Sequence, residues 1–149
     1  MNRVTDDFWL VVEDDDNDFF LFRRACTKAF NSAEPIIHRA KDGLVARVLL
    51  QTITPNLIVS DLKMPCSTGL QLVEWMRCQN NLKNLRFVML TSSDLEEDRK
   101  SASQLGVDDY RVKPAEYRNL VKMIREIAAG QTFLNLSPCS TGNKVSRIA

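Results

Sequence analysis

The sequence has no excess of charge of either sign. Its 149 residues include 20 lysine and arginine residues and 19 aspartate and glutamate residues, which gives a formal net charge of +1. A nucleic-acid-binding domain usually carries a strongly basic surface. We therefore expect no direct binding to nucleic acid.

Paired cysteines and long apolar runs are also missing. The four cysteines lie far apart without a C-x-x-C spacing, which is typical of reduced thiols rather than of a disulfide framework or a zinc site. No run approaches the roughly 18 apolar residues of a membrane span, and the polar residues 1–7 are unlike a signal peptide. These absences predict a soluble, cytoplasmic protein with no membrane partner.

Short apolar runs alternate with segments of helical spacing along most of the chain. The runs that predict strands cover residues 8–12, 35–40, 57–60, 87–90 and 110–112. Two of them, 57–60 and 87–90, are continuously apolar, as expected for central strands covered on both faces. The alternation predicts an α/β fold: a flavodoxin-like, doubly wound sheet of five parallel strands in the order 2-1-3-4-5, with helices on both faces.

The segments between the strands carry apolar residues at helical spacing. The expected helix positions are Phe19, Phe22, Cys26 and Ala29, then Leu44, Val45, Val48 and Leu49, then Leu70, Val73, Trp75 and Met76, and finally Tyr117, Leu120, Ile124 and Ile127. We expect the first helix to be capped by Asp16, Asn17 or Asp18. Segment 95–105 favours a helix but has few apolar residues, so we expect it to be loosely packed.

The pattern also predicts the domain limits. Residues 8–130 form the predicted domain, and residues 1–7 precede it as a short extension. The tail, 131–149, is rich in small and polar residues with scattered apolar ones, so we expect it to be flexible or to dock on the domain surface. No second large domain is expected at this length.

Polar residues follow four of the predicted strands at the point where each strand ends. They are Glu13, Asp14, Asp61, Thr91, Ser92 and Lys113. In a sheet of order 2-1-3-4-5 these four strands are neighbours, and ligands bind at their carboxyl ends. The sequence therefore predicts one pocket that contains three carboxylates and a lysine.

Three crowded carboxylates repel one another unless a cation joins them. Mg²⁺ suits this role, because it prefers oxygen ligands and is commonly held by one or two carboxylates and a phosphate. Asp61 can then act as the nucleophile that accepts a phosphoryl group, with Thr91 and Lys113 bound to the phosphate oxygens. Taken alone, the acidic run 13–16 is more typical of a helix N-terminus, and only its combination with Asp61 and Lys113 favours a metal site.

The motifs together resemble the receiver domains of response regulators. They are Val11-Val12-Glu13-Asp14, Ser60-Asp61-Leu62-Lys63-Met64-Pro65 with Gly69, Leu90-Thr91-Ser92, and Tyr110-Arg111-Val112-Lys113-Pro114. The resemblance covers residues 8–129 and extends to single-domain, chemotaxis-regulator-like proteins, including those that serve bacterial phytochromes. It implies a phosphoacceptor of a two-component phosphorelay that assists its own phosphorylation and dephosphorylation and is not otherwise an enzyme.

The resemblance assigns the metal and phosphate sites. Asp61 would be the phosphoacceptor, Asp14 a direct Mg²⁺ ligand, Glu13 a ligand through water, and the Lys63 backbone carbonyl a further ligand. Lys113 would pair with the phosphate. Many receivers have aspartate where this sequence has Glu13, whose longer side chain suits a contact through water.

The resemblance also assigns residues to the conformational switch. Thr91 would be the switch hydroxyl, and Tyr110 the aromatic side chain that turns inward with it. Lys63 and Ser93 occupy positions that control attack of water on the phosphoaspartate, and a lysine there predicts slow self-dephosphorylation. The Lys113–Pro114 bond is cis in receivers of this kind.

Three functions are compatible with this sequence. In the first, a sensor histidine kinase, such as a phytochrome, or a phosphotransfer protein donates to Asp61, and the signal passes to a protein partner or a homodimer. The second is a scaffold that no longer needs phosphate, which the retained site residues disfavour. The third is a Mg²⁺-dependent phosphatase, which would need a general acid where Lys63 stands.

Overall fold

The computed structural model describes residues 7–130, where strands and helices alternate strictly. The strands are β1 (Phe8–Val12), β2 (Ile36–Ala40), β3 (Leu57–Ser60), β4 (Arg86–Thr91) and β5 (Asp109–Val112). The helices are α1 (Asp16–Ala29), α2 (Gly43–Leu49), α3 (Gly69–Arg77), α4 (Glu96–Gln104) and α5 (Tyr117–Ala128). The predicted tail, 131–149, and most of the predicted extension, 1–7, lie outside the described residues.

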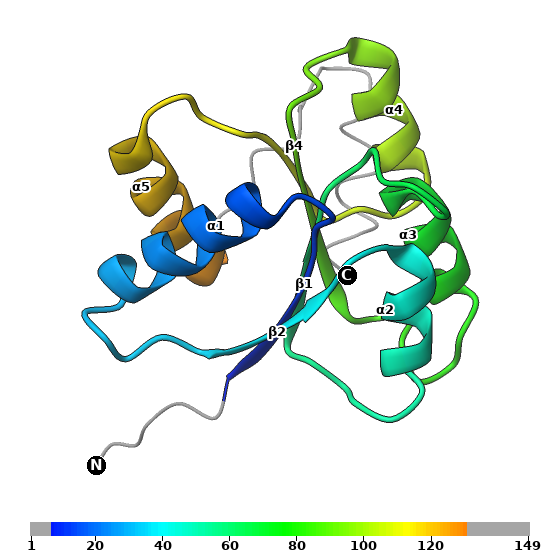
Figure 1. Cartoon of the computed structure of the whole chain (residues 1–149). Helices are drawn as coiled ribbons and strands as arrows, with labels where there is room; N and C mark the ends of the chain where they lie inside the picture. Colours follow the sequence, from blue (N-terminus) through cyan, green and yellow to red (C-terminus); the bar gives the residue numbers. More distant parts are fainter. Residues whose placement is uncertain (1–6, 131–149) are drawn as a thin grey trace.

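The strands form one parallel sheet in the order β2-β1-β3-β4-β5, which confirms the predicted fold. Figure 1 shows α1 and α5 on one face of this sheet and α2, α3 and α4 on the other. Successive strand residues point to opposite faces, so one apolar run supplies both cores. In β1, Trp9 and Val11 belong to the core beneath α1 and α5, whereas Leu10 and Val12 belong to the core on the other face.

Helix α2 forms where it was predicted, but of its four predicted apolar positions only Leu49 packs against the core. Leu44 and Val48 are 50% and 64% exposed. The buried residues of α2 are Gly43 and Ala46, and at Gly43 the helix lies too close to the loop before α3 for a side chain to fit. A Cβ atom at Gly43 would lie 2.6 Å from the Oγ atom of Ser67.

Helix α4 is as thinly packed as its sequence predicted. Ala102 is its only buried residue, and its first turn carries Glu96, Glu97 and Asp98. A helix with so little buried apolar surface is weakly held to the sheet. In the part of the chain that the structure describes, no helix is both long enough and apolar enough to cross a membrane.

Gly69, the first residue of α3, allows a close approach between that helix and the end of β3. A side chain there would collide with the carbonyl oxygen of Asp61 and would place its Cβ atom 2.9 Å from the sulfur of Met89. Because the obstacle includes backbone, it cannot be relieved by a side-chain rotation. Gly69 therefore fixes the position of the segment that carries Asp61.

We predict that Gly69→Ala lowers the free energy of unfolding by about 3 kcal/mol, the upper range for overpacking a core position. Urea unfolding measures this loss. Gly130→Ala serves as the control, because nothing lies within 4 Å of a Cβ atom at Gly130 and only its positive φ opposes the change. That control should lose about 1 kcal/mol. Equal losses in the two variants would contradict the proposed steric role of Gly69.

Candidate functional site

The sheet register brings the carboxyl ends of four strands together. The backbone amide of Asp61 donates a hydrogen bond of 3.0 Å to the carbonyl of Val12, which aligns the ends of β1 and β3. The amide of Lys113 donates a hydrogen bond of 2.8 Å to the carbonyl of Thr91, which aligns β4 and β5. The predicted site residues thus lie at one edge of the sheet.

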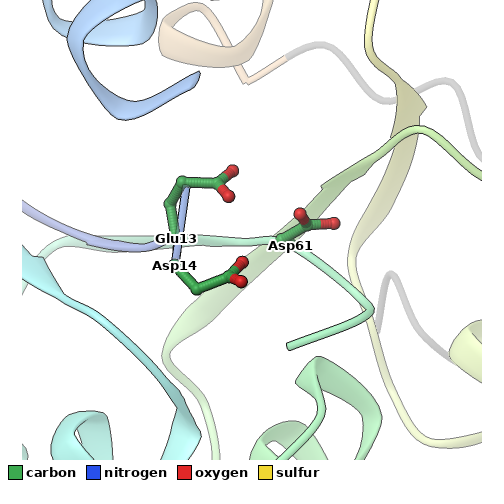
Figure 2. Close-up of side chains that lie close together, drawn as sticks. All are labelled: Glu13, Asp14 and Asp61. Atoms are coloured by element: carbon green, nitrogen blue, oxygen red, sulfur yellow. The ribbon is translucent and has the colours of Figure 1, made fainter. Parts of the chain in front are cut away.

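Three carboxylates form a cluster at this edge. Each of Glu13, Asp14 and Asp61 offers an oxygen atom, and these atoms lie within 4.8 Å of one another. Figure 2 shows the Glu13 and Asp14 side chains extending from the end of β1 toward Asp61 at the end of β3. The predicted acidic cluster is therefore present.

The three carboxylates differ in how their oxygens are occupied. Glu13 is buried and accepts hydrogen bonds from the amide of Asp15, at 3.1 Å, and from Lys113. Asp61 accepts one from the amide of Leu62, at 2.7 Å, and one from Lys113. Among residues 7–130, none is found to bind the side chain of Asp14, so its carboxylate is the most available to a cation.

The Lys113 ammonium group lies at the centre of the site. Its Nζ atom donates hydrogen bonds of 2.8 Å to Glu13, 2.8 Å to Asp18 and 3.1 Å to Asp61. An ammonium group has three N–H donors, so these contacts use all of them. Lys113 therefore supplies positive charge to three carboxylates at once.

Burial and charge shift the pKa values of the two most enclosed groups. Burial raises the pKa of Glu13 from 4.5 to about 7, although its hydrogen bond with Lys113 opposes this. Burial alone would lower the pKa of Lys113, but the hydrogen bonds to Asp18 and Glu13 and the charge of Asp61 raise it above its ordinary value. Lys113 thus stays protonated. Burial disfavours the ionised form of Glu13, and a further cation nearby would stabilise that form.

The donor set fits a hard divalent cation such as Mg²⁺. Three carboxylates offer oxygen ligands, which Mg²⁺ prefers. Both oxygens of Glu13 already accept hydrogen bonds, which suits a ligand that acts through water better than a direct one. The cluster and Lys113 together can bind a metal ion and a phosphate.

Thr91 and Tyr110 are linked through Ser93. The Ser93 amide donates to Oγ1 of Thr91 at 3.2 Å, and the Tyr110 hydroxyl donates to the Ser93 carbonyl at 2.9 Å. Ser93 also donates its hydroxyl to Asp98 of α4 at 2.5 Å. Tyr110 is buried beneath Arg99, so its side chain is already turned inward.

Two further predicted positions can be placed. Lys63 lies exposed in the loop after β3, near Asp61 in the chain. The Lys113–Pro114 peptide bond is trans, so the expected cis bond was wrong. The trans form is favoured by about 0.5–1 kcal/mol for such a bond, and nothing in the hydrogen bonds of Lys113 requires the alternative.

The structure adds Asp18 to the site and places Arg39 against the backbone of Glu13, and the sequence had indicated neither contact. Asp18 was expected to be one possible helix cap, but Asp15 caps α1 and leaves Asp18 to bind Lys113. Arg39 donates to the carbonyl of Glu13 at 3.0 Å and pairs with Asp16 at 2.8 Å. An acidic residue in the first turn of α1 was a signal for Asp18, but many helices carry such a residue without a binding role.

The chain is similar in sequence to response regulators. A family model described as the response regulator receiver domain matches residues 10–125. The response regulator Rcp1 of a Synechocystis species is 32% identical over 125 residues, covering 79% of this chain and 84% of Rcp1. The nitrate/nitrite response regulator protein NarL of Escherichia coli is 32% identical over 100 residues, covering 67% of this chain but only 45% of NarL. The chain thus matches less than half the length of NarL.

The fold is also similar to those of solved response regulators. The manganese-bound form of Rcp1 has a TM-score of 0.72 at 27% identity, covering 87% of this chain and 96% of that chain. The phosphorylated cyanobacterial phytochrome response regulator RcpA has a TM-score of 0.76 at 24% identity, covering 83% of this chain and 91% of that chain. At 24% identity the second likeness establishes the fold alone.

The raised pKa of Glu13 predicts a pH-dependent stability. The folded pKa of about 7 exceeds the ordinary 4.5, so the stability associated with a neutral Glu13 is present below pH 4.5 and lost as the pH rises through 7. With divalent metal removed by EDTA, Glu13→Gln should be more stable than the native protein at about pH 8, by up to about 3 kcal/mol. Urea unfolding at several pH values measures the difference.

The difference between Glu13→Gln and the native protein should vanish well below pH 4.5, where Glu13 is neutral in both the folded and the unfolded protein. Glu74→Gln removes a carboxylate from the exposed face of α3 and should change little at any pH. A native protein that is more stable than Glu13→Gln at high pH would show that Lys113 compensates fully for the burial of Glu13.

Proposed function

Because the chain belongs to the response regulator receiver domain family of two-component systems, we propose that it accepts a phosphoryl group on Asp61 and changes conformation in response. One observation carries this proposal. The Asp61 carboxylate lies at the end of a central strand, 3.1 Å from the Lys113 ammonium group and within 4.8 Å of two other carboxylates. A carboxylate that could act as the nucleophile, an ammonium group and two further carboxylates that could bind a metal ion thus lie together.

The residues of the site have complementary roles in phosphoryl transfer. An Asp61 oxygen attacks the phosphorus of the donor, and the donor's leaving group departs with the electron pair of the broken bond. The Leu62 amide holds the other Asp61 oxygen at 2.7 Å, which orients the carboxylate. Lys113 and the Thr91 hydroxyl bind the oxygens of the transferred group.

Asp14 and Asp61 would hold Mg²⁺ directly, Glu13 would hold it through water, and the Lys63 backbone carbonyl would complete the protein ligands. When bound, the ion neutralises negative charge on the transferred group. The manganese-bound form of Rcp1 supports a divalent ion in a relative of this fold. In this chain the available Asp14 carboxylate and the raised pKa of Glu13 support the same role.

Thr91, Ser93 and Tyr110 would transmit the change. Movement of the Thr91 hydroxyl toward the phosphate would break its hydrogen bond with the Ser93 amide. Ser93 also binds Tyr110 and Asp98, so its displacement would alter the surface formed by β5 and α4. Tyr110 is already inward, so the change would lie in what Tyr110 binds and in the position of α4.

The phosphoryl donor is inferred from the family. Receiver domains receive their phosphoryl group from sensor histidine kinases, directly or through a phosphotransfer protein. A phytochrome is our first candidate, because the sequence motifs resemble those of single-domain regulators that serve bacterial phytochromes; RcpA, which shares the fold, is described as a phytochrome response regulator. The output would pass to a protein partner or through a homodimer, in the cytoplasm and without direct contact with nucleic acid.

We predict that the native protein gains one phosphoryl group when incubated with acetyl phosphate and Mg²⁺, and that Asp61→Asn does not. An amide is a far weaker nucleophile than a carboxylate, so the loss should be complete within the sensitivity of intact mass spectrometry. EDTA should abolish the gain by the native protein. Asp16→Asn, which removes an exposed carboxylate paired with Arg39, should still be phosphorylated.

The controls separate the possible failures of this experiment. A gain retained in Asp61→Asn would place the phosphoryl group on another residue. No gain by folded native protein would favour a scaffold that works without phosphate.

The exposed Lys63 predicts a long-lived phosphoaspartate, because its side chain can shield the phosphoryl group from water. Lys63→Ala should shorten the half-life several-fold, roughly the effect of losing one weak charged contact of about 1 kcal/mol. The decay of phosphorylated mass after removal of the donor measures this. Lys100→Ala, in the exposed part of α4, is the control and should leave the half-life unchanged. A native half-life of seconds would contradict the prediction.

A further inference from the structure

Asp18 binds Lys113 but has no role in the proposed reaction as described above. Its Oδ2 atom lies 2.8 Å from the Nζ atom of Lys113, which is closer than Asp61 at 3.1 Å. The Asp18 side chain is 41% exposed, whereas that of Lys113 is 18% exposed. Asp18 thus reaches from the surface of α1 to an ammonium group that is largely enclosed.

Local structure holds Asp18 in this position. Its backbone amide donates to the side chain of Asp15, the N-cap of α1, at 2.9 Å. This cap fixes the first turn of the helix and hence the direction of the Asp18 side chain. Asp16 lies in the same turn but pairs with Arg39 instead of Lys113. The contact with Lys113 is therefore specific to one of two neighbouring carboxylates.

The three partners of Lys113 would have different roles in the reaction. Asp61 would carry the phosphoryl group, so its oxygen becomes part of the bond being made. Glu13 belongs to the carboxylate cluster that would share a cation. Asp18 is outside that cluster and is not the nucleophile, so it can keep its hydrogen bond with Lys113 throughout.

We propose that Asp18 is a positioning residue that holds the Lys113 ammonium group in place for the phosphoryl group on Asp61. This inference rests on the proposed function. When the transferred group arrives, Lys113 exchanges its longest contact, with Asp61, for a phosphate oxygen and retains Asp18 as its fixed partner. Without Asp18 the ammonium group has only partners that the reaction or the metal ion also uses.

The opposite effect is expected if Asp18 matters only through its charge. A negative charge near the site repels an anionic phosphodonor, so its removal would accelerate phosphorylation. Loss of a positioning contact would slow the reaction instead. The direction of the change therefore distinguishes a positioning role from general electrostatic repulsion.

The test compares rate constants for phosphorylation by acetyl phosphate with saturating Mg²⁺ in the full chain. Asp18→Asn should be about tenfold slower than the native protein, because it offers Lys113 only a neutral acceptor in place of a carboxylate and so weakens a hydrogen bond between charged groups. Asp16→Asn removes the same charge from the same turn and should not be slowed. Asp18→Ser repeats the test if the amide variant does not fold.

A double-mutant cycle shows whether Asp18 acts through Lys113. Lys113→Gln should be slow by itself, and adding Asp18→Asn to it should cause no further loss. Binding of Mn²⁺, measured by calorimetry, should stay within about twofold in Asp18→Asn, because Asp18 is outside the metal cluster. If Asp18 had a purely structural role, Asp18→Asn would lower the rate both in the native protein and in Lys113→Gln.

Each result decides between distinct conclusions. A rate for Asp18→Asn equal to or above that of Asp16→Asn would overturn the positioning role and leave the proposed function intact. An equal loss in the presence and absence of Lys113 would overturn it as well. Failure of the native protein to be phosphorylated would overturn the proposed function and, with it, this inference.

Discussion

The hydrogen bonds of Lys113 make the rest of the site possible. Carboxylates that approach within 4.8 Å of one another at a partly buried sheet edge would repel strongly without a cation. Lys113 joins two of them and Asp18 with all three of its donors. Burial raises the pKa of Glu13 even though Lys113 opposes this, so the charge of that carboxylate is not fully compensated. Lys113 therefore holds the site together, and the site still favours the arrival of a second cation.

The fold was predictable because parallel sheets impose a simple pattern. Central strands of a parallel sheet are largely apolar, and chemically active residues lie at their carboxyl ends. The sequence therefore predicted β3 with Asp61 and β4 with Thr91. The packed face of α2 was not predictable in this way. Its apolar residues have helical spacing, but the loop before α3 leaves no room for a side chain at Gly43, a constraint that arises from tertiary packing.

The site was predictable to the extent that its residues follow strands. The role of Asp18 was not predicted, because Asp18 lies on a helix and binds a residue that is 95 positions away in the chain. Its residue type in a first helical turn has a sufficient local explanation, a favourable interaction with the helix dipole. The inward position of Tyr110 likewise depends on its hydrogen bond to the carbonyl of Ser93, and a backbone contact of this kind cannot be predicted from a sequence pattern.

Ser93 has a consequence for how such a protein can evolve. One residue binds Thr91 through its amide, Tyr110 through its carbonyl and α4 through its hydroxyl. The same residue occupies a position proposed to control access of water to the phosphoaspartate. Under the proposed function, the duration of the signal and its transmission share one residue. A substitution there keeps the backbone links to Thr91 and Tyr110 but removes the hydroxyl link to Asp98, so selection for a longer or shorter signal at this position also changes how α4 is held.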